Sequence, residues 1–234
     1  MKSKVTTYLL YAIGEITLVV VGILIAVQID DWNKQRERLQ LEITTLKQIK
    51  SNLQMTVISL NKCIEDYREE GQLIKEGLHY IKKYQNLPDS MHKNLIYVLF
   101  FPTPKLNTSA YENLKNIGTD LIRNDTLRSK IIRIHEDDFY YLINELDQAQ
   151  RNLKTTITPM LTKYIRIDAT NRENRDFPEV SITNMDDLTK DEAFINTLYY
   201  CQSYEKLGFH DTSSIRNHVE ELIAEIDKEL ERLK

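Results

Sequence analysis

The amino-acid sequence predicts an all-α protein, in which one N-terminal transmembrane helix continues into a long helix packed in an elongated helical bundle. A nearly uncharged apolar run occupies residues 8–29, apolar residues recur every three or four positions over residues 39–81, and only six Gly and five Pro occur among 234 residues. The first pattern is typical of a membrane span, the second of a helix with one apolar face, and the low Gly and Pro content argues against an all-β chain. We therefore divide the chain into a tail and transmembrane anchor over residues 1–31 and a helical bundle domain over residues 32–234.

The apolar run at residues 8–29 carries one charge, Glu15. At ~1.5 Å rise per residue, a helix of this length spans ~33 Å, which covers the ~30 Å hydrocarbon core of a bilayer. A cleaved signal peptide has a shorter apolar region and a small-residue cleavage site, which this run lacks. A buried helix of a soluble domain seldom carries fourteen near-continuous apolar residues, as residues 16–29 do. We favour a retained anchor, with a signal peptide and a buried core helix as the alternatives.

Charge at the two ends of the run sets the expected orientation, because Lys and Arg decide membrane topology and acids contribute little. The N-terminal tail has Lys2, Lys4 and the α-amine, and the other flank has Lys34, Arg36 and Arg38. The two sides are nearly equal, but a short N-terminal tail readily stays in the cytoplasm. We therefore expect the C-terminal domain to lie outside the cytoplasm, with the lipid bilayer as one partner.

Glu15 is the most unusual residue of the run, because a carboxylate within a membrane helix is costly and marks a functional candidate. Its place near one end of the run also lets it reach the interface. Gly22 and Ala26 form a small-x-x-x-small pair, which permits close approach of two helices. We predict that Glu15, Gly22 and Ala26 mediate association of the membrane helix, either in a homo-oligomer or with another membrane or periplasmic protein.

Residues 33–84 contain no Pro and are predicted to form one helix that stops near Asn86, before Pro88. Thirteen positions spaced alternately by four and three form a heptad seam, and all of them except Lys50 and Gly71 are apolar or aromatic. The seam consists of Leu39, Ile43, Leu46, Lys50, Leu53, Val57, Leu60, Ile64, Tyr67, Gly71, Ile74, Leu78 and Ile81. Four further residues widen the apolar stripe, as a bundle core requires: Leu41, Ile49, Ile58 and Leu73.

Prolines and capping residues divide the middle of the chain into shorter helices. We expect a short helix between Asp89 and Phe101, which Pro102 ends. A longer helix over residues 125–157 follows, with a cap from Asn124-Asp125 and with Pro159 at its end or at a kink.

Two more helices are predicted in the C-terminal part. A capping box of Thr189 and Glu192 begins the first, and Gly208 ends it. Residues 211–214 cap the last helix. Residues 168–188 are polar and aperiodic, which predicts an exposed loop. No segment alternates like a strand for more than a few residues.

Residues 109–118 form a short connector between these elements. Ser109 and Glu112 have the spacing of a capping box, and Gly118 fits a helix end. Tyr111 shares one helix face with the leucine three residues later, so we favour the interpretation that the two plug the bundle. The alternative is a partner-binding edge formed by Tyr111, Glu112 and Asn113.

Two stretches are distinctive as sequences. They comprise residues 8–16, 22–26, 28–29 and 32–33, and then residues 108–115 with Gly118, Leu121 and Ile122. Together they resemble an uncharacterised family of Bacteroidota membrane proteins, domain of unknown function 6090, although this chain has Asp30-Asp31 where the family usually has Asn-Asn. The resemblance implies a single-pass inner-membrane protein of a Gram-negative cell, and it implies no activity.

Motifs that carry chemistry are weak in this sequence. There is no nucleophile elbow, Walker loop or dinucleotide-binding glycine motif. Residues 135–138 read His-Glu-Asp-Asp, but position 139 is Phe139 where a zinc helix would have its second His, so we interpret them as a solvated helix face. Cys63 and Cys201 both lie near apolar stripes, which favours buried free thiols over a disulfide.

These observations predict a non-enzymatic scaffold or interaction module, with no catalytic residues, metal or cofactor. With 31 Lys+Arg against 35 Asp+Glu, the formal charge of −4 also excludes a nucleic-acid partner. The alternative is a periplasmic sensor bundle for a small molecule or peptide, which a deep pocket lined by several tyrosines and a buried charge would favour. A hydrolase is the third hypothesis, and the absence of a visible nucleophile–base pair argues against it.

Overall fold

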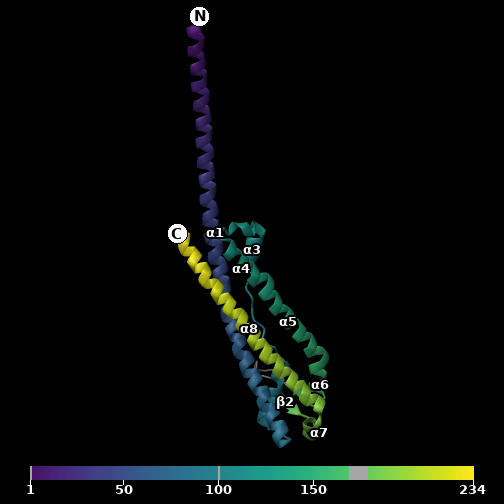
Figure 1. Cartoon of the computed structure of the whole chain (residues 1–234). Coiled ribbons are helices and arrows are strands. Elements are labelled where there is room, and N and C mark those ends of the chain that lie inside the picture. Colours follow the sequence, from purple (N-terminus) through teal and green to yellow (C-terminus); the bar gives the residue numbers. More distant parts are fainter. Residues whose placement is uncertain (1, 100, 169–178) are drawn as a thin grey trace.

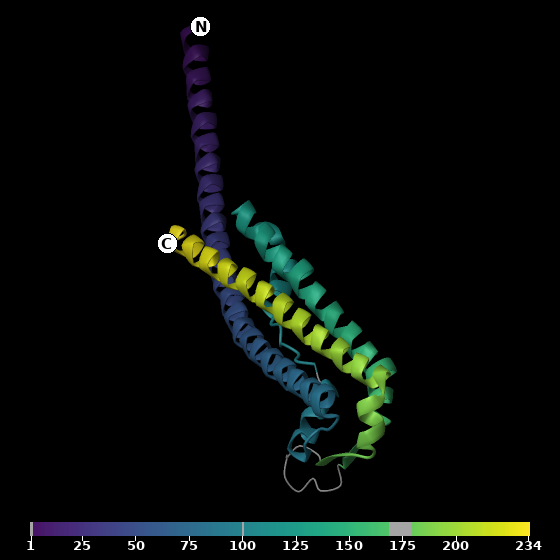
Figure 2. The same ribbon diagram turned by 60° about the horizontal axis from the view of Figure 1, so that its bottom comes forward.

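The computed structural model describes residues 2–99, 101–168 and 179–234 and shows an elongated molecule built from three helical rods (Figure 1). The first rod is α1 (Lys2–Tyr84), and the last is α8 (Glu192–Arg232). The rod between them in sequence combines α4, α5 and α6. Figure 2 shows α8 lying between α1 and the α4–α6 rod along much of their length. The prediction of a predominantly helical bundle is confirmed.

Helix α1 runs unbroken for 83 residues, so the predicted continuity of the N-terminal run with the long bundle helix is confirmed. It ends at Tyr84, where Gln85 adopts a left-handed φ of 46° shortly before Pro88. Its first part projects beyond the rest of the molecule (Figure 1). Within the residues that the structure describes, no helix combines the length and apolarity needed to cross a membrane.

The heptad seam of α1 faces the bundle, since each of its thirteen positions is buried or half-buried. The predicted widening of the stripe is only partly right. Ile49 is fully buried, but Leu41 is 43% and Ile58 is 71% exposed. Ile58 lies on the solvent side of α1, whereas Leu41 borders an open hollow beside Ile117 and Leu121.

Short elements connect the first two rods. Helix α2 (Asp89–His92) and the 3-10 turn η1 (Lys93–Leu99) occupy the predicted short helix. An extended segment leads to α3 (Ser109–Ile117) and η2 (Thr119–Leu121). The predicted capping box is wrong, because the N-cap position is Thr108 and Ser109 instead accepts a hydrogen bond at 2.8 Å from the Asn52 side chain. Gly118 ends α3 as expected, with a φ of 113° that L side chains rarely adopt.

The middle rod contains two π-helical turns. Its elements are α4 (Asp125–Arg133), η3 (Ile134–Asp138), α5 (Phe139–Asn152), η4 (Leu153–Ile157) and α6 (Thr158–Thr162). Asn124 caps α4 by accepting a hydrogen bond from the Leu127 N–H, as predicted. Pro159 lies in the first turn of α6, directly after η4, where its missing N–H is tolerated.

A small hairpin replaces part of the predicted loop. Strands β1 (Ile165–Asp168) and β2 (Glu179–Ile182) pair antiparallel with Ile165 opposite Ile182, and α7 (Met185–Lys190) follows. The part of the predicted loop at residues 169–178 lies outside the described residues. The hairpin escaped prediction because each strand has only four residues, too few for a period of two to stand out.

Helix α8 is a single 41-residue helix, so the predicted break at Gly208 is wrong. Its N-cap is Asp191, whose carboxylate accepts hydrogen bonds from two backbone N–H groups, and not the predicted Thr189–Glu192 box. A Cβ added at Gly208 would lie 2.5 Å from the Tyr67 ring. The glycine therefore serves close packing of α1 against α8, and residues 211–214 continue the helix instead of capping one.

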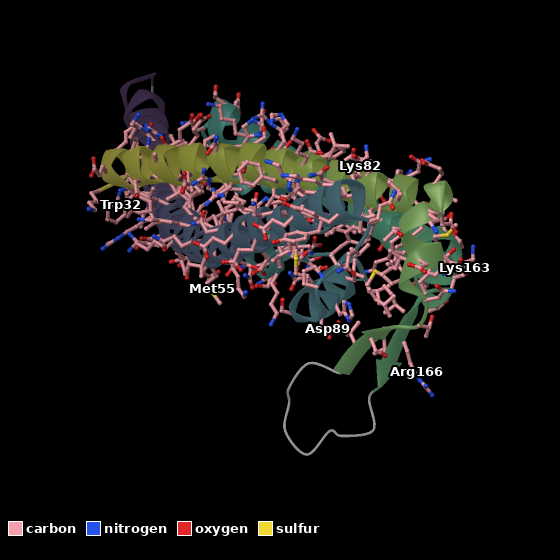
Figure 3. All side chains as sticks on the ribbon, turned by 90° about the horizontal axis from the view of Figure 1, so that it is seen from below. Trp32, Met55, Lys82, Asp89, Lys163 and Arg166 are labelled. Atoms are coloured by element: carbon pink, nitrogen blue, oxygen red, sulfur yellow. The ribbon has the colours of Figure 1, made fainter. Side chains whose placement is uncertain are left out.

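Two apolar cores lie along the rods. The proximal core joins the part of α1 around Leu53 to α3, α4, α5 and the C-terminal half of α8. The distal core joins the end of α1 around Leu78 to η1, α6, the hairpin and the N-terminal half of α8. Figure 3, seen from below, shows the side chains that fill the space between these helices. The stretch between the two cores contains polar side chains.

Candidate functional site

The projecting part of α1 carries the three residues predicted to mediate helix association. Glu15, Gly22 and Ala26 are all exposed, and a Cβ added at Gly22 would meet no atom within 4 Å. Large apolar side chains surround them on α1 and are 47–75% exposed: Ile16, Leu18, Val19, Val20, Val21, Ile23, Leu24, Ile25, Val27, Ile29 and Trp32. The predicted association through the first three residues stays a prediction.

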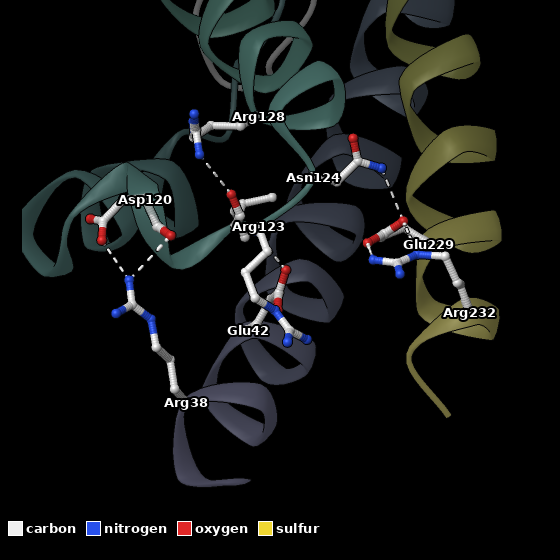
Figure 4. A network of polar contacts seen from close by, with 9 residues as sticks. Arg38, Glu42, Asp120, Arg123, Asn124, Arg128, Glu229 and Arg232 are labelled. Carbon is white, nitrogen blue, oxygen red and sulfur yellow. Dashed lines mark hydrogen bonds and ion pairs between the residues drawn. The ribbon is translucent and has the colours of Figure 1, made fainter. Parts of the chain in front are cut away.

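A polar network holds α1 to the bundle where the projection ends (Figure 4). We call this network the collar, and it comprises Arg38, Glu42, Asp120, Arg123, Asn124, Glu229 and Arg232. Glu42 is completely buried, and its two carboxylate oxygens accept hydrogen bonds from the backbone N–H and the Nε of Arg123 at 2.9 and 2.7 Å. Arg38 pairs with Asp120 in η2. Both contacts tie α1 to the segment that precedes α4.

The C-terminal end of α8 joins the same collar. Glu229 is 4% exposed, and its carboxylate accepts hydrogen bonds from Asn124 Nδ2 and from the Arg232 guanidinium. The Arg232 bonds, followed by the Asn124 bond, lower the pKa of Glu229 below its ordinary value. Three segments far apart in sequence are thus held together at the point where α1 leaves the bundle.

The predicted connector residues divide into two groups. Tyr111 is 3% exposed, and its hydroxyl donates a hydrogen bond to Glu136 at 2.8 Å. Its ring stacks on His135 with 4.2 Å between centroids. Glu112 and Asn113 are exposed. The plug interpretation therefore fits Tyr111, while a partner-binding role stays a prediction for the exposed pair.

The stacking on Tyr111 also corrects the interpretation of residues 135–138. His135 is 8% exposed, not solvated, and its Nδ1 lies 2.8 Å from the Ile131 carbonyl oxygen. It belongs to the π-helical turn η3. Burial lowers the pKa of His135, and Asp138 pairs with His218 of α8 at 2.9 Å. The solvated-face interpretation therefore holds for Glu136 and Asp137, which are exposed, and is wrong for His135.

Two carboxyls, the buried Glu205 and the half-buried Glu70, lie in the zone between the two cores. Glu205 of α8 is 2% exposed and lies against Gly71 of α1, where an added Cβ would be 3.4 Å from the Glu205 Cβ. Among the described residues, Glu205 Oε2 and Glu70 Oε2 have no hydrogen-bond partner. Burial raises the pKa of Glu205 to about 9 and that of Glu70 to about 8. Both groups therefore favour the protonated form.

A cavity of about 140 Å³ opens beside this zone, between α5 and α8. Tyr67 of α1 forms its floor, and the Tyr67 hydroxyl donates a hydrogen bond to the Pro102 carbonyl oxygen at 3.2 Å. Two more tyrosines and two acids reach it from the other helices. The full lining comprises Tyr67, Tyr141, Leu142, Glu145, Leu146, Ala149, Tyr204, Leu207, Gly208 and Asp211.

The two cysteines are free and buried, as predicted. Burial raises the pKa of both the Cys63 and the Cys201 thiols to about 12, so both stay protonated near neutral pH. Within the described part of the chain, no group of three or more His, Cys, Asp or Glu side chains is arranged to hold a metal ion.

The sequence interpretation missed Tyr67 as a cavity residue and missed Glu70 and Glu205 altogether. A signal for Glu205 was present in the sequence. Starting from Cys201, steps of four and three residues reach Glu205, Gly208 and Thr212 before Ile215. That spacing places Glu205 on the apolar face of α8 once Gly208 is read as part of the helix.

Comparison with known proteins identifies one matching family, and that family has no assigned activity. No curated protein and no solved structure matches the chain. The family described as "Family of unknown function (DUF6090)" matches residues 15–199, which include most of α1, the connector and the start of α8. Because this match covers more than half of the sequence, the chain belongs to the DUF6090 family.

Proposed function

We propose that this protein is a membrane-anchored, non-enzymatic helical scaffold or interaction module. In this proposal, the projecting part of α1 is a single-pass anchor in the inner membrane of a Bacteroidota cell, and the bundle extends into the periplasm. The observation that carries the proposal is the exposure of apolar side chains over residues 16–32. Contiguous apolar surface of this extent is unfavourable in water, and it marks a surface that meets lipid or protein.

The collar supports the same function. Its ion pairs and hydrogen bonds lie where the projection joins the bundle. They fix the direction in which the bundle leaves the projection, because α1 and α8 are both bound there to the segment that precedes α4. A scaffold needs this fixed direction to present its surfaces at a defined distance from the anchor.

Membrane extraction of the full chain tests the anchor. The wild-type protein should stay in the membrane pellet after an alkaline carbonate wash. A double change, Ile23→Asp with Ile25→Asp, should release it into the supernatant, because an aspartate at the centre of a span costs ~3 kcal/mol. Ile58→Asp is the matched control, since Ile58 is equally apolar and 71% exposed but lies on the bundle.

Two outcomes of that experiment decide the matter. Retention of wild type and of Ile58→Asp, with loss of the double variant, supports the anchor. Release of the wild-type protein by carbonate would show that the projection docks on a protein instead. Protease added to spheroplasts tests the orientation, because digestion of the bundle places it outside the cytoplasm and full protection reverses the topology.

A second candidate function is a ligand-binding bundle, and the cavity between α5 and α8 favours it. Three tyrosines and two acids line that cavity, and the buried Glu205 lies next to its floor residue Tyr67 in the zone between the cores. Helical bundles commonly hold ligands between facing helices. This candidate is compatible with the anchor, because the cavity lies within the bundle and not on the projection.

A further inference from the structure

The cavity between α5 and α8 has an apolar floor and a polar rim. On the floor, Leu142 is 2%, Ala149 is 3% and Tyr67 is 5% exposed. The rim carries Tyr141 and Asp211, which are joined by a hydrogen bond of 2.9 Å from the tyrosine hydroxyl to the carboxylate. Such a site accepts a group with an apolar body and one polar end.

The formal charges on the rim are negative. Glu145 comes from α5 and Asp211 from α8, and the described lining residues include no Lys or Arg. The tyrosines stay neutral near pH 7. Burial, followed by the hydrogen bond to Asp211, raises the pKa of Tyr141 to about 12, and burial raises that of Tyr204 as well. The rim therefore repels anions and attracts a cation.

The aromatic lining selects the kind of cation. The rings of Tyr67, Tyr141 and Tyr204 border one small volume, and an ammonium group is attracted to the faces of aromatic rings. A metal ion is a poor fit, because only two carboxylates reach the cavity and hard cations take six or more oxygen ligands. An organic ammonium instead uses the carboxylates, the rings and the apolar floor together.

The size of the cavity limits the ligand further. Its volume is about 140 Å³. An engineered cavity of ~150 Å³ in another protein binds benzene, which has six heavy atoms. We propose that the cavity between α5 and α8 binds the head of an alkylammonium ion of about this size, with the charge between Glu145 and Asp211. This inference rests on the ligand-binding candidate and is independent of the anchor.

Calorimetric titration of the full chain in detergent micelles, with three probes of matched size, tests the proposal. The probes are n-butylammonium, 1-butanol and butyrate. Butylammonium should bind about tenfold more tightly than 1-butanol, because only the cation gains from the carboxylates and ring faces. Butyrate should not bind. Equal binding of 1-butanol and butylammonium, or any tighter binding of butyrate, would overturn the proposal.

Isosteric variants locate the site. Glu145→Gln with Asp211→Asn removes both rim charges and keeps the side-chain shapes, so butylammonium binding should weaken about tenfold or more. Asp147→Asn is the matched control, because it removes one exposed carboxylate of α5 that does not line the cavity. Unchanged binding by the double variant would contradict the proposal. If the double variant loses its helical circular dichroism, each single variant is titrated, and each should weaken binding.

A fourth probe identifies the source of the ammonium group. Nα-acetyl-lysine methylamide has the same alkylammonium head on a peptide backbone. Binding as tight as that of butylammonium assigns the group to a lysine of a partner, and binding of butylammonium alone assigns it to a free small amine. Failure of every probe would refute this inference and leave the carbonate-extraction result for the anchor unaffected.

Discussion

The collar and the zone between the cores bury carboxylates in opposite ways. In the collar, Glu42 and Glu229 are almost inaccessible to solvent, yet each accepts hydrogen bonds from an arginine. In the zone between the cores, Glu205 is equally inaccessible, but within the described structure one of its oxygens has no partner. The pKa of Glu229 falls and that of Glu205 rises to about 9. Burial raises the pKa of the acid that lacks partners, whereas hydrogen bonds from Arg232 outweigh the effect of burial at Glu229.

The two regions therefore have different roles: the collar holds α1, α8 and the segment before α4 together, and the zone between the cores contains carboxyls that titrate. In the collar, hydrogen bonds from Arg232 and Asn124 hold the Glu229 carboxylate in a fixed geometry and keep its pKa below the ordinary value. The zone between the cores holds protonated groups that ionise at alkaline pH. Changes at the two places should consequently differ in size and in pH dependence.

The largest loss of stability is expected from a new carboxylate in an apolar core, where it has neither an arginine partner nor polar surroundings. Leu60 is completely buried in the proximal core. Leu60→Asp should destabilise the bundle by more than ~3 kcal/mol, because it introduces an unpaired charge into apolar surroundings. Thermal unfolding followed by circular dichroism measures this, with the exposed Ile58→Asp as control. A wild-type melting temperature for Leu60→Asp would show that the heptad register is wrong.

The next effect concerns Glu205 and depends on pH. Its pKa is about 9 in the folded protein against 4.5 for the free side chain, so the folded state binds more protons between these values. The free energy of unfolding of the wild type should therefore fall as pH rises from 5 to 9. Glu205→Gln removes this contribution, so its stability relative to wild type should increase with pH by up to about 1.4 kcal/mol per pH unit between pH 5 and pH 9.

Urea unfolding at pH 5, 7 and 9 measures that difference. Part of the slope should persist in Glu205→Gln, because Glu70 has a pKa of about 8 and titrates in the same direction. Glu231→Gln removes an exposed carboxylate from the same helix and should leave the slope unchanged. An identical slope in wild type and in Glu205→Gln would mean that Glu205 is paired in the folded protein.

A smaller effect is expected in the collar. Arg123→Met keeps the aliphatic stem and removes the partner of the buried Glu42 carboxylate. The loss should be ~1–2 kcal/mol, because the Arg123 backbone N–H still donates to Glu42 and the guanidinium is half-exposed. Urea unfolding at pH 7 measures it. Lys34→Met is the control, because it removes an exposed ion pair with Asp30 on the projection. If Arg123→Met costs no more than this control, the collar does not stabilise the attachment of α1.

The smallest effect is expected at the connector. If Ser109 were the N-cap of α3, Ser109→Ala would cost ~1 kcal/mol. Because Thr108 occupies the cap position and Ser109 makes an exposed bond to Asn52, the loss should be only a few tenths of a kcal/mol. Urea unfolding distinguishes the two values. A loss of ~1 kcal/mol would mean that Ser109 does cap α3 after all.

The features that were predicted correctly from the sequence are those that depend on a local residue pattern. The seam of α1, the helix end at Gly118 and the Asn124 cap follow from spacing and from single-residue preferences, and all three are confirmed. The membrane span, the orientation and the association through Glu15, Gly22 and Ala26 stay predictions.

What the sequence did not predict depends on contacts between distant segments. Gly208 was read as a helix end because glycine usually breaks a helix, whereas its role is set by the Tyr67 ring on another helix. Asp191 takes the cap that Thr189 was expected to supply, because its carboxylate reaches two N–H groups. The cavity and the Arg123–Glu42 pair likewise join residues from separate rods.

The unbroken course of α1 has a mechanical consequence. At ~1.5 Å per residue, the path along α1 from Trp32 to Tyr84 is ~78 Å. Since no residue in that stretch interrupts the helix, α1 acts as a spacer of fixed length. The hairpin lies at the end of the bundle away from the projection (Figure 1). Under the proposed anchor, a partner lying flat on the membrane can touch the collar, and only one that reaches outward can touch the hairpin.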